Sequence, residues 1–136
     1  MNLKISSQLS AVRRRIGFTL IELLVVMSVI ATLLTIAVPR YFQHLDRARE
    51  ASLRESLAVM RDAVDKYRGD TGRYPETIEE LVTKRYLRKV PPDPITESTE
   101  TWVIVPPPDE PGQKKVWDIR SGAEGQGLNG SDYSTW

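Results

Sequence analysis

A single carboxylate interrupts a long apolar stretch near the start of the chain. The 21 residues from Phe18 to Val38 read FTLIELLVVMSVIATLLTIAV, and Glu22 is their only charged member. A carboxylate in an apolar span costs roughly 2.5–3.5 kcal/mol at the helix centre and less near the end, so intramembrane acids usually have a cationic partner. No basic residue lies between Gly17 and Pro39. Cleavage after Gly17 would supply a cation, because Phe18 would then carry an α-amino group that is largely protonated at neutral pH. Glu22 of one copy would pair with that amine in the next copy.

A second group of side chains with possible chemistry lies in the C-terminal stretch DIRSGAEGQGLNGSDYSTW. Its glycines leave it free to curl, and oxygen atoms are supplied by Glu124, Asn129, Ser131 and Asp132. Hard oxygens on a turn-rich loop suit calcium, which takes about 6–8 oxygen ligands, many of them backbone carbonyls. The stretch lacks the Asp-x-Asp-x-Asp-Gly pattern and the closing Glu of an EF-hand. A flexible polar tail is the alternative interpretation, and composition alone favours it.

The remaining composition argues against an enzyme and against a nucleic-acid-binding protein. The 136 residues contain no cysteine and one histidine, His44, just past the apolar stretch. The chain has neither a phosphate-binding Gly-x-x-x-x-Gly-Lys-Ser/Thr loop nor a dinucleotide-binding glycine motif. Its net charge is +1, which becomes −3 without the four basic side chains before Gly17. Nucleic-acid-binding proteins carry clustered positive charge instead, so we expect neither catalysis nor nucleic-acid binding.

The apolar stretch itself predicts a membrane-spanning helix. A helix of that length measures roughly 31 Å, enough for a bilayer core of about 30 Å. Basic residues upstream, Lys4 and Arg13 to Arg15, predict a cytoplasmic N-terminus and an exported C-terminal part. A secretory signal peptide is an alternative, but its apolar core would span about 7–15 residues and end in a small-x-small cleavage site. An ordinary one-span anchor fits the length and the flanks but leaves Glu22 unexplained.

The residues after the span continue as a helix with an apolar stripe. Apolar side chains recur mostly every three or four positions, which predicts an amphipathic helix over 40–67 whose stripe packs in a core. The stripe consists of Tyr41, Leu45, Ala48, Leu53, Leu57, Met60, Val64 and Tyr67. Charged residues, Glu50 among them, fill the other faces.

The rest of the chain predicts a small α+β domain. The capping-box spacing from Thr77 to Glu80 predicts a short helix near 76–84. A proline-rich loop at 90–94 precedes two strand-like runs, 101–105 and 115–119, which PPPDEPGQK joins as a hairpin. We therefore expect an α+β fold: a long N-terminal helix, first transmembrane and then amphipathic, packed on a small domain. That domain contains the short helix, a small antiparallel sheet and a glycine-rich C-terminal loop.

The segment Arg15-Ile16-Gly17-Phe18-Thr19-Leu20-Ile21-Glu22 resembles the processing signal of type IV pilins and their relatives. The basic leader, the glycine, the Phe-Thr-Leu-Ile-Glu sequence and the apolar run agree, and Pro39 matches a proline that breaks or kinks the long helix in this family. The resemblance implies that a prepilin peptidase cuts between Gly17 and Phe18 and methylates the new N-terminus. It also implies that Glu22, fifth in the mature chain, pairs with the Phe18 amine of a neighbouring subunit during assembly. The expected parts are a leader (1–17), a transmembrane and assembly helix (18–38) and an exported domain (39–136).

Further along, the chain resembles the major, G-type pseudopilins of type II secretion systems. The likeness is carried by Tyr67-Arg68-Gly69-Asp70-Thr71-Gly72-Arg73-Tyr74-Pro75, by Leu81-Val82 and by YLRKVPPDP over 86–94. In that family a Ser-Leu-Gly-Ala-Asp-Gly loop and a later Asp bind a structural calcium. Ser121-Gly122-Ala123-Glu124-Gly125 resembles this loop with one residue missing and Glu124 in place of Asp, and Asp132 resembles the later Asp. The resemblance thus implies a calcium site at Glu124, Asp132 and Ser121 that would hold the tail of a cysteine-free domain.

The resemblance implies a structural protein rather than an enzyme. Copies of the chain would polymerise into a pseudopilus that drives protein export, starting as single-pass inner-membrane subunits with a periplasmic C-terminal domain. The implied partners are prepilin peptidase, minor pseudopilins, an inner-membrane assembly platform and a cytoplasmic ATPase.

Two alternatives remain open from the sequence. Residues 95–99 depart from the Trp-Gly-x-Pro-Tyr that the family usually has, so a minor pseudopilin or a type IV pilin is the closer one. Type IV pilins commonly carry a C-terminal disulfide loop, which a cysteine-free chain lacks. The more distant one is a single-span membrane protein with an exported binding module, in which Trp102, Trp117 and Trp136 line a ligand surface.

Overall fold

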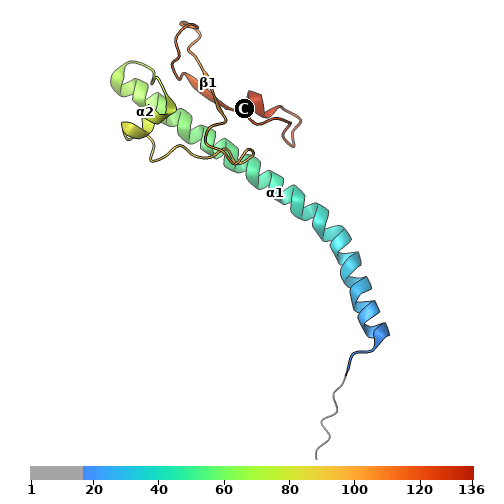
Figure 1. Cartoon of the computed structure of the whole chain (residues 1–136). Coiled ribbons are helices and arrows are strands. Elements are labelled where there is room, and N and C mark those ends of the chain that lie inside the picture. Colours follow the sequence, from blue (N-terminus) through green and yellow to red (C-terminus); the bar gives the residue numbers. More distant parts are fainter. Residues whose placement is uncertain (1–16) are drawn as a thin grey trace, which may run out of the picture. The chain divides into compact units, whose positions relative to one another are not determined.

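A computed structural model describes residues 17–136, and all structural statements below concern this part of the chain. The predicted leader lies outside it except for Gly17. The elements in chain order are α1 (Leu20–Thr71), α2 (Ile78–Thr83), β1 (Trp102–Val105), β2 (Asp118–Ser121) and a 3₁₀ helix, η1 (Tyr133–Thr135). The chain forms two compact units, with the boundary between Pro39 and Arg40. Helix α1 crosses this boundary and contributes to both units (Figure 1). This element list confirms the expected α+β class, with one long helix, one short helix and a small antiparallel sheet.

The first unit contains the apolar part of α1. Every described residue up to Pro39 is exposed, so this stretch has no core of its own. Pro39 lies inside α1 and does not end it. A proline removes one backbone hydrogen bond from a helix, and the helical residues on both sides of Pro39 continue without it.

The second unit is organised around the rest of α1. Its buried face is formed by Leu53, Leu57, Met60, Ala63, Val64 and Tyr67. The predicted stripe is therefore correct from Leu53 onward, but its first part is wrong: Tyr41 is 64% exposed and Ala48 is also exposed. The helix ends at Thr71, four residues later than predicted. Gly72 stops it with a left-handed φ of 74° and donates its N–H to the Arg68 carbonyl at 2.8 Å.

The short helix α2 forms where the capping-box spacing predicts it. Thr77 is its N-cap, and the Thr77 hydroxyl accepts the Glu80 N–H at 3.1 Å. The Glu80 carboxylate reaches back and accepts the N–H of Glu76 at 2.8 Å, one residue before the N-cap N–H that a capping box would use. Ile78 and Leu81 bury their side chains in the core.

The sheet is a two-stranded antiparallel ladder in which Trp102 pairs with Ser121 and Val105 with Asp118. The first strand agrees with the prediction, whereas β2 lies about three residues later than expected. The reason is a contact with a distant part of the chain: the Val116 N–H donates to the Pro75 carbonyl at 2.8 Å, so the chain joins β1 only after this contact.

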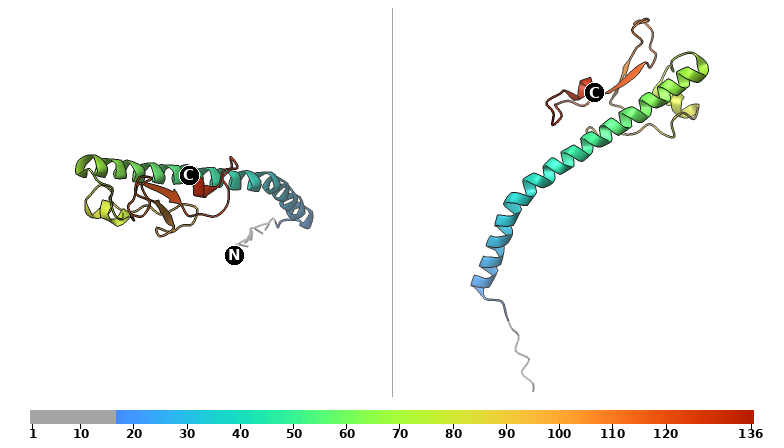
Figure 2. Two further views of the ribbon diagram at one scale, coloured as in Figure 1. Left: turned by 90° about the horizontal axis from the view of Figure 1, so that it is seen from above. Right: turned by 180° about the vertical axis from the view of Figure 1, so that it is seen from behind.

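The core of the second unit lies between α1 and everything that follows it. Trp102 and Ile119 of the sheet, Leu81 and Leu87 around α2, and Tyr133 of the tail all belong to one buried cluster with the α1 face. Figure 2 shows α2, the sheet and the C-terminal tail along one side of the second part of α1. The C-terminal tail is therefore part of the packed domain.

Candidate functional site

The predicted processing site lies at the very start of the described structure. Gly17, Phe18 and Thr19 precede α1, and the Phe18 side chain is 87% exposed. Thr19 caps the helix, because its hydroxyl accepts the Glu22 N–H at 3.2 Å and its carbonyl accepts the Leu23 N–H at 3.2 Å. The Thr-x-x-Glu spacing was a capping signal that the sequence reasoning used at Thr77 but missed here. The peptide bond after Gly17 thus lies in exposed, non-helical chain shortly before α1 begins.

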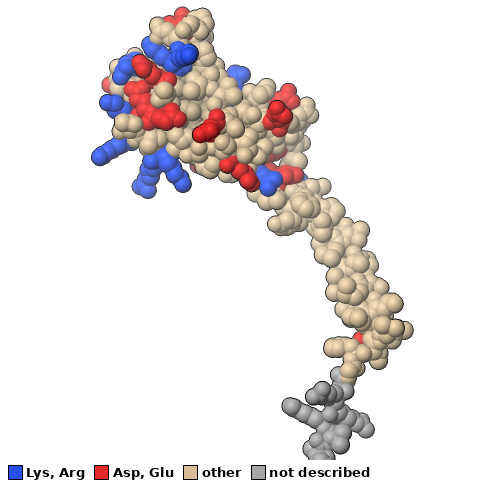
Figure 3. Space-filling view, viewed as in Figure 1, with Lys and Arg blue, Asp and Glu red and all other residues tan. Residues whose placement is uncertain are grey.

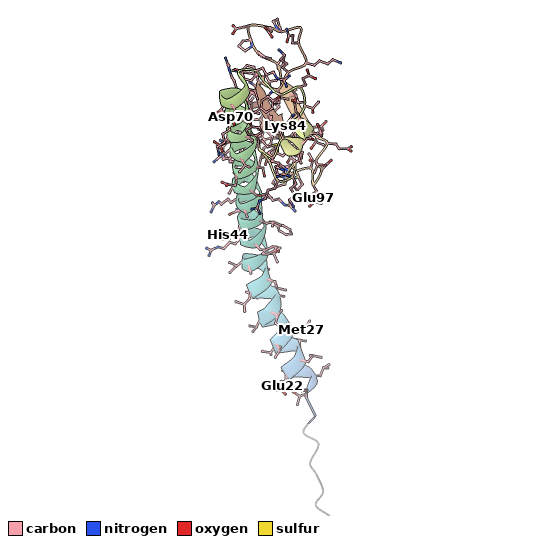
Figure 4. All side chains as sticks on the ribbon, turned by 90° about the vertical axis from the view of Figure 1, so that its left-hand side faces the viewer. Glu22, Met27, His44, Asp70, Lys84 and Glu97 are labelled. Atoms are coloured by element: carbon pink, nitrogen blue, oxygen red, sulfur yellow. The ribbon has the colours of Figure 1, made fainter. Side chains whose placement is uncertain are left out.

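Glu22 lies in the first turn of α1 (Figure 4). Its side chain is exposed, and within residues 17–136 it takes part in no ion pair. The other polar side chains of the span are satisfied by their own helix. The hydroxyls of Ser28, Thr32 and Thr35 each donate to the carbonyl four residues earlier, at 2.8–2.9 Å. Among the polar side chains between Leu20 and Val38, Glu22 is therefore the one without a hydrogen-bond or ion-pair partner in the described chain.

The surface around Glu22 is apolar. Leu20, Ile21 and the large side chains that follow are 43–84% exposed as far as Val38. This stretch is almost uniformly uncharged in Figure 3, whereas acidic and basic side chains gather on the second unit. By length and composition α1 is the one helix in residues 17–136 that can cross a membrane. Such a surface needs a membrane or other copies of the same stretch to cover it.

The three residues predicted to bind calcium meet at one pocket of the C-terminal tail. Ser121, Glu124 and Asp132 line it together with Gly125 and Ser134. Glu124 and Asp132 are exposed, and in the described chain neither is in an ion pair. The 17–136 segment contains no cluster of three or more His, Asp or Glu side chains, so a cation here would draw most of its ligands from carbonyls.

Ser121 differs from the other two. Its side chain is fully buried, and its hydroxyl donates to the Asp93 carboxylate at 2.5 Å and accepts the Ala123 N–H at 3.1 Å. Because the hydroxyl is already used on both sides, Ser121 contributes to the pocket by holding its wall rather than by a free side-chain oxygen.

Sequence reasoning missed a residue that fixes the other wall of this pocket. Glu50 was expected on the charged surface of α1 but is only 8% exposed. Its carboxylate accepts the Leu128 N–H at 2.6 Å and the Tyr133 hydroxyl at 3.2 Å. Burial and the Glu50 carboxylate raise the pKa of the Tyr133 hydroxyl above its ordinary value, which keeps it a donor. The available signal was position: Glu50 lies three residues before Leu53 and seven before Leu57, on the buried face.

The aromatic surface that the binding-module alternative requires is largely absent from the described domain. Trp102 is buried, and its ring N–H donates to the Pro91 carbonyl at 2.8 Å. Trp136 stacks edge-on against Tyr133 and lies under the Arg54 guanidinium, 4.4 Å from its ring centre. Only Trp117, at 40%, is substantially exposed. His44 is exposed on α1 (Figure 4).

Comparison with known proteins supports the sequence interpretation at both ends of the chain. Residues 12–38 match the prokaryotic N-terminal methylation motif. The type II secretion system core protein G of Pseudomonas aeruginosa is 30% identical, with 91% of this chain and 96% of that protein covered. The proteins of the same name from Aeromonas hydrophila and Vibrio cholerae are 28% and 27% identical over 91% of this chain and 94% and 93% of their own lengths. The comparison with solved structures found no match.

These similarities extend over nearly the whole chain and agree with the elements that the structure describes. The methylation motif reaches into the exposed start of α1, and the similarity to the Pseudomonas aeruginosa core protein covers 91% of this chain. The chain therefore belongs to the family of type II secretion system core protein G.

Proposed function

We propose that this protein is the major subunit of a type II secretion pseudopilus, a filament built from copies of this chain. The observation that carries the proposal is the start of α1: an accessible cleavage motif followed directly by a wholly exposed apolar helix. Membership of the core protein G family and the methylation motif indicate processing by prepilin peptidase and a role as a pseudopilus subunit. The protein acts as a building block and not as an enzyme in this proposal.

Processing at Gly17–Phe18 supplies the charge that Glu22 lacks. After cleavage, Phe18 carries an amine that can pair with Glu22 of an adjacent, axially shifted copy. Pairing in an apolar environment offsets the desolvation of both charges and fixes the axial register of neighbouring subunits. The amine on Phe18 and the carboxylate on Glu22 are thus the two halves of one assembly contact.

Before assembly, the same helix holds the subunit in the inner membrane as a single-pass protein. Four basic residues before Gly17 keep the leader in the cytoplasm, which places the second unit in the periplasm. Growth of the filament requires a machine that extracts each subunit from the bilayer. An assembly platform in the inner membrane, a cytoplasmic ATPase and minor pseudopilins are the partners that fit this role.

We further propose that the tail pocket binds a structural calcium ion. Glu124 and Asp132 would provide carboxylate oxygens, and backbone carbonyls of the turn-rich tail the remaining ligands. Ser121 takes part through its backbone and through the wall that its hydroxyl holds. In a domain without disulfides, such an ion would link the two segments of the tail that line the pocket, 121–125 and 132–134.

The mass of the intact protein extracted from membranes of its native host tests the proposal. We expect a species that lacks Met1 to Gly17 and carries one added methyl group. A full-length, unmethylated mass from cells with a working prepilin peptidase would contradict it and favour an ordinary membrane anchor.

A further inference from the structure

Two carboxylates are buried in a domain that otherwise keeps its charges at the surface. Glu50 is 8% exposed and Asp93 is fully buried; with Ser121 they are the buried polar side chains of the described chain. Burying a carboxylate is costly unless hydrogen bonds compensate it. Both carboxylates are compensated, and both receive their compensation partly from the C-terminal tail, far away in sequence.

Asp93 holds the first wall of the tail pocket. One carboxylate oxygen accepts the Ile95 N–H at 2.8 Å, which closes the loop around Asp93 itself. The other accepts the Ser121 hydroxyl at 2.5 Å, and the Ser121 oxygen in turn accepts the Ala123 N–H at 3.1 Å. This chain of hydrogen bonds fixes the backbone immediately before Glu124.

Glu50 holds the second wall, the segment that contributes Asp132 and Ser134 to the pocket. A single carboxylate oxygen accepts the Leu128 N–H and the Tyr133 hydroxyl, so it spans the chain on both sides of Asp132. The Tyr133 N–H also donates to the Gly125 carbonyl at 3.2 Å, which connects this wall to the one that carries Glu124. Glu50 thereby ties the tail to α1 on both sides of Asp132.

We propose that Glu50 and Asp93 are positioning residues for calcium: Asp93, through Ser121, places Glu124, and Glu50, through Tyr133, places Asp132. The inference rests on the calcium site proposed above and adds residues that do not touch the ion. A loop whose walls are already ordered loses less conformational entropy when the ion binds. Groups that hydrogen-bond to metal ligands and orient them, without touching the metal, typically contribute about 10–100-fold to metal affinity.

Calcium titration of the full chain in detergent, by calorimetry, tests each wall separately. Ser121→Ala cuts the connection from Asp93, and Glu50→Ala removes the connection to α1. Each is expected to weaken calcium binding about 10–100-fold. Glu55→Ala is the matched control, since Glu55 is an exposed glutamate on the same helix; it should bind calcium as the wild type does. If Glu50→Ala fails to fold, Tyr133→Phe removes one hydroxyl of the same wall.

Hydrogen exchange in the presence of a chelator gives a second readout that does not depend on the ion. Both wall variants should exchange the amides of residues 123–133 faster than the wild type, whereas Asp132→Asn should weaken calcium binding without this loss of protection. Folded wall variants with the wild-type calcium affinity would overturn the positioning role alone. A wild-type chain that binds no calcium would overturn the calcium site itself, and the positioning role with it.

Discussion

Glu22 is the residue on which assembly depends in our proposal. Its carboxylate is exposed in the first turn of an apolar helix, and no basic residue lies between Gly17 and Pro39, so cleavage supplies a cation within this stretch. We expect Glu22→Ala to leave cleavage and methylation intact, as read by mass, and to abolish filaments, as read by electron microscopy of sheared fractions. Ser28→Ala is the control, because the Ser28 hydroxyl is already bonded to its own helix. Filaments of normal yield from Glu22→Ala would contradict the pairing.

A second carboxylate, Glu80, sets a predicted pH dependence. The Tyr67 hydroxyl donates to it at 2.5 Å, the Glu76 N–H donates at 2.8 Å, and Arg73 lies 3.5 Å away. The Tyr67 hydrogen bond, followed by the Glu76 amide, lowers the pKa of the Glu80 carboxyl below its ordinary value of 4.5, against the opposing effect of burial. A carboxyl with a lowered pKa in the folded state stabilises the fold above the unfolded-state pKa. That stabilisation is lost as the pH falls below 4.5 and through the folded pKa.

Glu80→Gln should therefore remove part of the acid sensitivity. We expect the pH dependence of the free energy of unfolding below pH 4.5 to shrink by up to about one proton. Urea denaturation at a series of pH values measures this slope. Glu79→Gln, an exposed neighbour on α2, should leave the slope unchanged. A wild-type slope in Glu80→Gln would show that Glu80 does not titrate with folding.

Some of these functional residues could be identified from the sequence and others could not. Phe18 and Glu22 could be identified because the signal is local: each is defined by neighbours within a few positions. The spacing from Glu50 to Leu53 could have placed Glu50 on the buried face of α1. No local pattern could identify the partners of Glu50 and Asp93, because these lie 78 and 28 residues further along the chain. Nothing in the sequence around a solitary glutamate tells which distant amide will fold onto it.

At the scale of elements, local rules predicted the helices better than the sheet. The cap at Thr77 depends on a short spacing, so the start of α2 can be read from the sequence. The end of α1 is less certain from the sequence, because the helix runs four residues past the predicted end, to the left-handed backbone of Gly72. The position of β2 depends instead on the Val116 contact with Pro75, 41 residues earlier in the chain. A strand pattern alone cannot show that one of its N–H groups is used elsewhere.

The end of β2 gives an element-scale prediction. A Cβ at Gly122 would overlap the carbonyl of Thr101, beside the start of β1. Gly122→Ala should therefore push the strands apart and lower stability by about 1–3 kcal/mol, as overpacking does. Gly112→Ala is the matched control, because nothing lies near its Cβ position in the hairpin loop. Chemical denaturation compares the two, and equal stabilities would contradict the tight contact.

At the scale of the whole molecule, the two units have different physical requirements. All residues from Gly17 to Pro39 are exposed, whereas the buried cluster begins at Leu53 and ends at Tyr133. The apolar unit thus adds no core to the second unit. The apolar unit must therefore be stabilised by the bilayer or by neighbouring subunits, which is consistent with a protein that moves from membrane to filament.

This separation predicts that residues 40–136 fold without the apolar unit. The fragment retains every residue of the buried cluster and both buried carboxylates with their partners. We expect it to be soluble without detergent and to unfold cooperatively within about 4 °C of the full chain in detergent, a shift that corresponds to less than about 1 kcal/mol in a domain of this size. Circular dichroism during heating measures both proteins. A fragment that unfolds far earlier would mean that the first half of α1 stabilises the domain, and assembly would then have to act on the fold as well as on the helix.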